Sequence, residues 1–119
     1  MTESKSIDQL LAAARGRLAR LTAAEAYSAV QDGALLVDVR SRDEARGQGA
    51  AIPGARCYSL SVVLWRLDEL PRETRVILIC RHGYSSSLAA AQLQELGCVH
   101  ATDVIDGVDG WRAAGLPLG

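Results

Sequence analysis

The feature that most constrains the fold is an apolar run that leads through a small polar loop into a helix-forming segment. Residues 75–79 are mostly β-branched and apolar, which predicts a buried strand. The loop over 80–86 has the sequence Cys-Arg-His-Gly-Tyr-Ser-Ser. Residues 87–96 are rich in strong helix formers, and Gly97 closes the segment. A thiol is therefore expected where a strand ends and a helix is about to begin.

This position has a chemical consequence for Cys80. The backbone N–H groups of such a loop and of the first helical turn have no partner within the helix, and the helix dipole adds partial positive charge. These surroundings favour the thiolate over the thiol, and the thiolate is the nucleophilic form of cysteine. Cys80 is therefore the candidate nucleophile of the chain.

Length and composition narrow the class of protein. The 119 residues, of which 49% are hydrophobic, are enough for one domain with a sizeable core. Thirteen basic and fourteen acidic residues give a net charge of −1, so there is no overall attraction to nucleic acid or to an anionic membrane. The three cysteines lack metal-ligand spacing, which predicts free thiols in a reducing compartment. No apolar leader or membrane-length apolar stretch is present, so we expect a soluble cytoplasmic protein.

The N-terminal segment has its own pattern. Apolar residues recur at helical spacing over residues 7–18, and arginines lie off that stripe. The pattern predicts an amphipathic helix that packs on its own domain; docking on a membrane or on a partner is the alternative. We treat residues 1–18 as an N-terminal helical extension and 19–119 as the main domain.

Helices and strands alternate along the rest of the chain. Thr22 and Glu25 fit a capping box that opens a helix ending near Asp32. The expected strands are near 19–21 and at 34–39, 56–58, 75–79 and 101–104, and the expected helices are at 22–32, 43–46, 61–70 (stopped by Pro71), 87–96 and from about 111 to 115. This order predicts an α/β fold with a mostly parallel sheet between helices. Ligands of such sheets bind at the carboxyl ends of the strands, which is where Cys80 is expected.

The other loop residues suit an anion site, although each also has a simpler role. Gly83 permits the backbone angles that turn loop N–H groups inward, and it would serve an ordinary turn equally well. Ser85 and Ser86 are good N-cap residues whose hydroxyls could also bind sulfur or an anion. Arg81 and His82 are either substrate-binding charges or solvated rim residues.

Outside the loop, structural roles are expected for most notable side chains. Asp38 and Arg40 follow each other at a strand end and are interpreted as a structural ion pair in preference to a catalytic one. A disulfide between Cys80 and another cysteine would make a redox switch, which the sequence leaves open. The remaining notable side chains are expected in the core or in loops that support it: Cys57, Cys98, Trp65 and Trp111. For Trp65, a place at the mouth of the pocket is the alternative.

Three segments, taken together, resemble the rhodanese-like domain. Residues 36–40, with Glu44 and 52–55, are similar to the N-terminal signature of that family. The loop 80–86 with the residues that follow resembles its active-site signature, and residues 106–117 resemble its C-terminal signature. The resemblance extends over nearly the whole chain after the N-terminal helix.

The resemblance implies a three-layer α/β/α fold with a five-stranded parallel sheet. It also implies that Cys80 accepts a sulfane sulfur from thiosulfate or a persulfide donor and passes it to a thiol or to cyanide, without metal or organic cofactor. No nucleic acid or membrane partner is implied, and a protein partner is open. The residues expected to bind the sulfur-containing anion are Arg81, His82, Gly83, Tyr84, Ser85 and Ser86.

The loop departs from the family pattern at Ser85. Many family members have an arginine where Ser85 stands, so one fixed positive charge is missing. A cysteine phosphatase of related fold would need an arginine at Ser86 to complete its C-x5-R motif, which disfavours that activity. A non-catalytic or redox-sensing binding module is the second alternative. The sulfur donor, the acceptor and the oligomeric state are left open.

Overall fold

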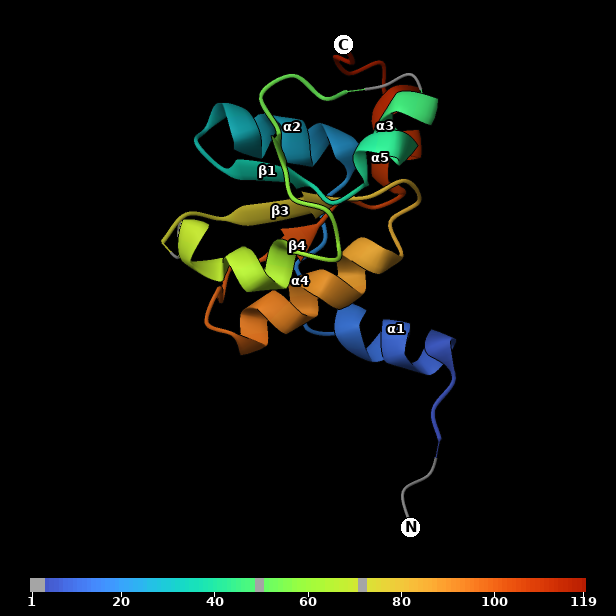
Figure 1. Ribbon diagram of the computed structural model, residues 1–119, viewed down its shortest axis with the longest axis vertical. Helices are drawn as coiled ribbons and strands as arrows, with labels where there is room; N and C mark the ends of the chain where they lie inside the picture. The colour runs from blue at the N-terminus through green and yellow to red at the C-terminus, as the bar shows by residue number, and fades with distance from the viewer. Residues whose placement is uncertain (1–3, 49–50, 71–72) are drawn as a thin grey trace.

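A parallel sheet forms the middle of the molecule (Figure 1). The computed structural model describes residues 4–48, 51–70 and 73–119, without the side chains of residues 67 and 68. The strands are β1 (Leu35–Asp38), β2 (Arg56–Cys57), β3 (Val76–Ile79) and β4 (Thr102–Asp103). They lie in the order β2-β1-β3-β4, and every pair of neighbours is parallel. The α/β class and the parallel sheet are thus confirmed.

The sheet has four strands in the described residues, so the expectation of five was wrong. The segment near 19–21 does reach the edge beside β4, but it pairs there through the single bridge of Leu21 with Val104. Leu21 N–H donates to the Asp103 carbonyl at 3.1 Å, and Ile105 N–H donates to the Leu21 carbonyl at 2.8 Å. The chain enters α2 directly afterwards, because Thr22 caps that helix. No length is left for a regular edge strand.

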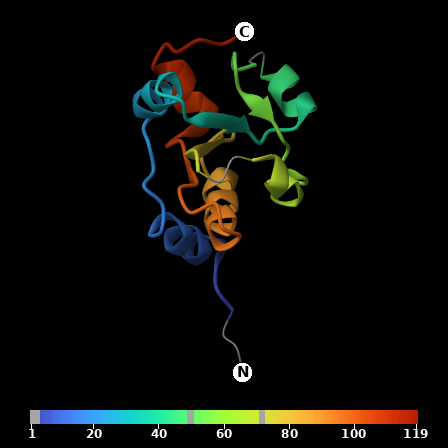
Figure 2. The same cartoon turned by 90° about the vertical axis from the view of Figure 1, so that its left-hand side faces the viewer.

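Helices lie on both sides of the sheet (Figures 1 and 2). One side carries α2 (Ala23–Gln31) and α5 (Gly107–Ala113), which contact each other. The other carries α4 (Ser85–Glu95), the 3-10 helix η1 (Val63–Glu69) and α1 (Ile7–Arg15). The short α3 (Arg42–Gly47) follows β1. Both views show α1 beside α4, and contacts between these helices confirm that the N-terminal helix packs on its own domain.

Successive side chains of the central strands pack on opposite sides of the sheet, and nearly all of them are buried, as expected for a sheet covered on both faces. Leu36, Ile77 and Ile79 pack with α2 and α5, whereas Val37, Leu78 and Cys80 pack with α4 and η1. Trp111 is buried in the first of these two clusters, as predicted. The sheet therefore fixes Cys80 on the same side as α4.

Capping explains why the first helices begin where they do. The box predicted at Thr22 and Glu25 is present, with both reciprocal hydrogen bonds. Equivalent boxes open α1, from Ser6, and α3, from Ser41. Each box satisfies N–H groups that the first helical turn leaves unpaired.

Several element boundaries differ from those predicted. The segment over 61–70 forms a 3-10 helix with a kink at Arg66, not a regular α-helix, and Pro71 lies outside the described residues. Helix α1 ends at Arg15 instead of residue 18, and α5 begins at Gly107, before Trp111. The early start of α5 has a tertiary cause, because its first N–H groups bond the loop that follows β3.

Two side chains expected in the core are exposed. Trp65 is 84% exposed on η1, so it neither packs in the core nor lines the pocket at Cys80. Cys57 is exposed because β2 is a two-residue strand at the edge of the sheet, where β1 is its one neighbour among the described strands. Cys98 is buried, as predicted, and all three cysteines are free thiols.

Candidate active site

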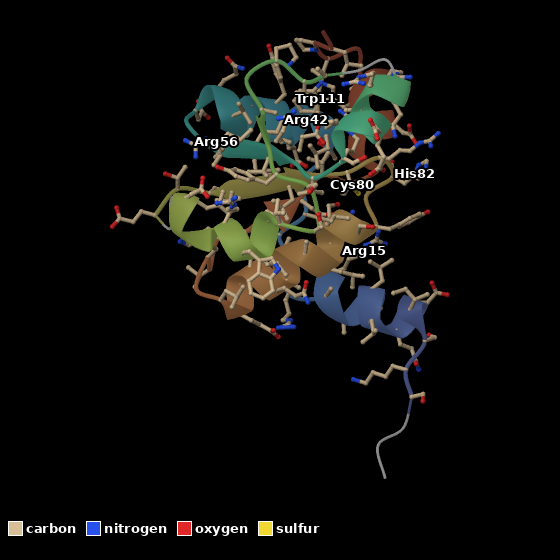
Figure 3. All side chains as sticks on the ribbon, viewed as in Figure 1. Arg15, Arg42, Arg56, Cys80, His82 and Trp111 are labelled. Carbon is tan, nitrogen blue, oxygen red and sulfur yellow. The ribbon has the colours of Figure 1, made fainter. Side chains whose placement is uncertain are left out.

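Cys80 lies directly after β3 and shortly before α4, as the sequence predicted (Figure 3). It is 7% exposed and belongs to the core cluster on the α4 side. It also lines a pocket of about 300 Å³ at the carboxyl end of the sheet, so the thiol has a route to solvent. The other lining residues are Val39, Arg40, Glu44, Leu60, Arg81, His82, Tyr84 and Ser85.

One backbone N–H of the loop contacts the sulfur, and other N–H groups of the loop have no acceptor in the residues that the structure describes. Gly83 N–H donates to Cys80 Sγ at 3.2 Å. Within the described part of the chain, the N–H groups of Arg81, His82 and Tyr84 have no hydrogen-bond acceptor. Unpaired N–H groups of a loop that leads into a helix form an anion-binding concavity. The expectation of a loop that can hold negative charge near Cys80 thus has a geometric basis.

Two glycines allow the loop to close against α5. Gly83 has φ +85°, and a Cβ at this position would lie 2.9 Å from Asp106 N and 3.0 Å from the Val104 carbonyl oxygen. Gly107 has φ +53°, and a Cβ there would collide with the Cys80 carbonyl oxygen. The close approach lets Val108 N–H donate to that carbonyl at 2.8 Å. Helix α5 therefore fixes the backbone of Cys80 through its carbonyl group.

Ser86 connects Cys80 to a buried carboxylate. The Ser86 Oγ lies 3.3 Å from Cys80 Sγ and 2.8 Å from Asp103 Oδ2. Asp103 has no exposed surface, and it also bonds Ser87 Oγ at 2.7 Å and Arg20 Nε at 2.8 Å. Neither serine at the helix start is the N-cap, which is Tyr84 without a side-chain cap bond; that part of the prediction was wrong. Ser86 does not cap the helix because its hydroxyl donates to the buried Asp103 instead.

Arg20, Arg15 and Asp103 were not among the predicted site residues. Arg15 donates to the Gly83 carbonyl at 2.8 Å and Arg20 donates to it at 3.1 Å, so both contact the loop that follows Cys80. The arginines lie off the apolar stripe of the N-terminal segment and resemble ordinary solvated charges in sequence. Asp103 did carry a signal, because an acidic residue in a short predicted strand of a covered sheet needs a buried partner.

The remaining predicted loop residues lie around the pocket mouth. Arg81, His82, Tyr84 and Ser85 are all exposed. His82 Nδ1 lies 2.6 Å from Asp109 Oδ2, so α5 fixes the imidazole ring. The Tyr84 ring is within 6.3 Å of the His82 ring, measured between centroids. These side chains form a polar rim with an aromatic member.

Asp38 and Arg40 form the buried ion pair that their sequence positions predicted. Arg40 NH2 donates to Asp38 Oδ2 at 2.7 Å, and both residues are almost fully buried. Gln48 accepts a further bond from Arg40 at 2.9 Å. The pair fixes the end of β1 at one wall of the pocket. Because both side chains are buried and bonded to each other, the geometry favours a structural role for this pair.

In residues 4–48, 51–70 and 73–119, no group of three or more His, Cys, Asp or Glu side chains is placed to hold a metal ion. None of the helices in the described part of the chain has the length and apolar character needed to cross a membrane.

Comparison with known families identifies the domain. The model of the rhodanese-like domain matches residues 22–114. The chain belongs to the rhodanese-like domain family. The match begins at the N-cap of α2 and therefore leaves α1 and Arg20 outside it.

Curated relatives of this rhodanese-like chain are named as sulfurtransferases. A protein of Allochromatium vinosum named "Sulfurtransferase" is 33% identical over 84 residues, which are 71% of this chain and 77% of the relative. The thiosulfate sulfurtransferase GlpE of Actinobacillus succinogenes is 34% identical over 102 residues, which are 82% of this chain and 87% of the relative. These alignments span most of both chains.

Solved structures share the rhodanese-like fold. The polysulfide-sulfur transferase homodimer of Wolinella succinogenes is 26% identical, with a TM-score of 0.77 over 94% of this chain and 85% of that one. A Rhodopseudomonas palustris protein of unknown function, described as a possible tyrosine phosphatase, has a TM-score of 0.87 over 100% of this chain and 98% of that one. At 24% identity the second likeness shows the fold alone.

Proposed function

We propose that this chain is a sulfurtransferase that carries a sulfane sulfur on Cys80 as a persulfide. Membership of the rhodanese-like family and the sulfurtransferase relatives support transfer of sulfur in general. The observation that carries the finer proposal is the position of Cys80 Sγ, which lines a pocket while Gly83 N–H donates to it. A small sulfur-containing anion is the donor class, and a thiol or cyanide is the acceptor class.

The first half-reaction loads the sulfur. The Cys80 thiolate attacks the outer sulfur of thiosulfate and forms a new S–S bond. The S–S bond of thiosulfate breaks, and sulfite leaves with its electron pair. The product is a cysteine persulfide whose outer sulfur carries the negative charge, so no external oxidant or reductant is needed.

The loop is suited to hold the charge that accumulates in this step. The N–H groups of Arg81, His82 and Tyr84 have no acceptor among the described residues, and Ser85 starts an eleven-residue helix. Preorganised N–H donors stabilise developing negative charge without reorganising during the reaction. The helix N-terminus adds partial positive charge in the same place. The amides thereby supply part of what a loop arginine would supply at Ser85.

Ser86 can stabilise the Cys80 thiolate by donating a hydrogen bond through its single hydroxyl proton. That proton points to Asp103 when Cys80 is a thiol, because Ser86 Oγ then accepts from the thiol. When the thiol ionises, the hydroxyl turns and donates to the sulfur. Asp103 keeps Ser87 and Arg20 as partners during this exchange. The buried carboxylate is therefore never left without hydrogen bonds.

The second half-reaction unloads the sulfur. An acceptor thiolate or cyanide attacks the outer sulfur, and the electron pair of the persulfide bond returns to Cys80 Sγ. Cyanide gives thiocyanate, and a thiol gives a new persulfide. Thiosulfate, polysulfide and glutathione persulfide are the donors to compare, and the rate of loading from each ranks them.

The test is mass spectrometry of the intact protein after exposure to thiosulfate. We expect the mass to rise by one sulfur atom, and cyanide or dithiothreitol to remove the adduct. Cys80→Ser abolishes the adduct, whereas the matched control Cys57→Ser retains it, since Cys57 is an exposed thiol on the edge strand. Absence of the adduct from the wild type with every donor would overturn the proposal in favour of a non-catalytic binding module.

The same preparation tests the phosphatase alternative. The C-x5-R motif would place an arginine at position 86, but Ser86 is fully buried and bonded to Asp103. No bidentate phosphate clamp is built there. We expect no Cys80-dependent hydrolysis of an aryl phosphate, and measurable hydrolysis that Cys80→Ser removes would contradict the assignment.

A further inference from the structure

Two arginines from outside the family match hold the carbonyl of Gly83. Arg15 belongs to α1, and its Nη2 donates to this oxygen at 2.8 Å. Arg20 Nη2 donates to the same oxygen at 3.1 Å. The Ser87 hydroxyl lies 3.2 Å away, but it is nearer to Asp103, at 2.7 Å, and has only one proton to give. The two guanidinium groups are therefore the principal donors to this carbonyl.

The direction of that carbonyl fixes the direction of the next N–H. In a planar trans peptide, the C=O of one residue and the N–H of the next point to opposite sides. Because α1 holds the Gly83 oxygen, the Tyr84 N–H points away from α1. This N–H has no acceptor in the described part of the chain, and Tyr84 lines the pocket together with Cys80. The residues that line this pocket include none from α1.

Arg15 contacts the loop at two further points. Its Nε donates to Ser87 Oγ at 3.3 Å, and its Cζ lies 5.6 Å from the centroid of the Tyr84 ring. Figure 3 shows Arg15 on the α1 side of the loop that carries Cys80. No carboxylate of the described residues forms a salt bridge with Arg15, in contrast to Arg17 and Arg20. Among the described residues, its positive charge therefore has no carboxylate partner beside the loop.

We propose that Arg15 is a positioning residue for sulfur transfer, which directs the Tyr84 N–H toward the donor anion by holding the Gly83 carbonyl. This inference rests on the proposed function of Cys80. It assigns the N-terminal helix a role in the reaction. The loop itself has Ser85 at the position where many family members have an arginine. Arg20 takes part in the same contact, but its main partner is the buried Asp103.

Arg15→Ala is the informative variant, and Arg17→Ala is its control. Arg17 lies just after α1 and pairs with the exposed Glu95, so its removal also takes away a positive charge near the helix end. Arg20 is unsuitable, because its loss would leave the buried Asp103 carboxylate without its positively charged partner. We expect thiosulfate to load Arg15→Ala roughly 10-fold more slowly than wild type, less than the full loss of an oxyanion donor because Arg20 still holds the carbonyl.

A second readout follows the amide itself and not the reaction. In a Cys80→Ser background, thiosulfate binding should shift the Tyr84 N–H resonance in a ¹⁵N–¹H spectrum. Arg15→Ala should weaken this shift, whereas Arg17→Ala should leave it unchanged. Arg15→Lys, which retains a charged donor for one carbonyl, should restore most of the loading rate.

The outcomes separate this proposal from the function on which it rests. If the wild type takes up no sulfur, the function fails, and the Tyr84 resonance still tests the placement of the amide. If the wild type loads sulfur and Arg15→Ala loads equally fast with an unaltered Tyr84 shift, the role of Arg15 is refuted. Equal slowing in Arg17→Ala also refutes it, because the cause would then be overall charge.

Discussion

Substituting Gly83 by alanine tests whether the loop depends on a close approach of backbones. Two costs arise at this position. A Cβ at positive φ costs about 1–2 kcal/mol. The same atom would lie 2.9 Å from Asp106 N, 3.0 Å from the Val104 carbonyl and 3.2 Å from Gly107 N. Because all of these are backbone atoms, the segment between β4 and α5 must shift, at an overpacking cost of about 1–3 kcal/mol.

Gly33 provides the matched control. It also has positive φ, at +106°, but a Cβ there would meet no atom within 4 Å. Gly33→Ala should therefore lose only about 1–2 kcal/mol of unfolding free energy, and Gly83→Ala about 2–5 kcal/mol. For a domain of this size, each kcal/mol lowers Tm by about 4 °C. The Gly83 variant should consequently melt several degrees below the Gly33 variant.

Function should separate the two variants more clearly than stability does. The Gly83 N–H is the group that donates to Cys80 Sγ at 3.2 Å, so a displaced loop loses this bond. We expect Gly83→Ala to load sulfur at least about 10-fold more slowly and Gly33→Ala to load at the wild-type rate. The assays are urea denaturation and timed mass spectrometry after addition of thiosulfate. Equal stability of both variants, with equal loading, would refute the reasoning.

Three further substitutions test separate contacts. Ser86→Ala removes the hydroxyl beside the loop thiol and should slow loading by about 10-fold while costing about 1 kcal/mol, measured by timed loading and urea denaturation. Asp38→Asn leaves Arg40 as a buried charge without its carboxylate and should cost about 3–5 kcal/mol in urea denaturation. Hydrogen bonds from Thr22 lower the pKa of Glu25 from its ordinary 4.5, so the stability lost in Glu25→Gln should be evident at neutral pH and should disappear as the pH falls below that value.

Each of these expectations can fail in a definite way. If Ser86→Ala loads sulfur at the wild-type rate, the Ser86 hydroxyl does not stabilise the thiolate. A loss below about 1 kcal/mol for Asp38→Asn would place the pair in the range of exposed salt bridges. A stability difference for Glu25→Gln that persists at acidic pH would assign the effect to packing and not to the charged capping bond.

The local features of the site could be predicted from sequence because they depend on neighbours along the chain. The run from 76 to 79 is apolar on both faces, and the segment after 86 is rich in helix formers. Together they placed Cys80 at the junction. The capping box at Thr22 likewise needs only a partner three residues on, and Asp38 and Arg40 are two residues apart.

The features that sequence did not predict depend on contacts between distant residues. Arg15 and Gly83 are 68 positions apart, and Arg20 and Asp103 are 83 apart. No local pattern distinguishes such arginines from solvated ones. The start of α5 at Gly107 was missed for a related reason, because glycine disfavours helix and the compensating hydrogen bonds come from the loop carbonyls.

The dependence of the active-site loop on α5 has a consequence for biosynthesis. The carbonyl groups of Cys80 and Arg81 are bonded by N–H groups of Val108 and Asp109, which are translated later than the cysteine itself. A nascent chain that still lacks α5 has β3 and the thiol, but it lacks the N–H groups that bond the two loop carbonyls. The proposed ability of Cys80 to carry sulfur should therefore arise late, when α5 docks on a nearly finished sheet.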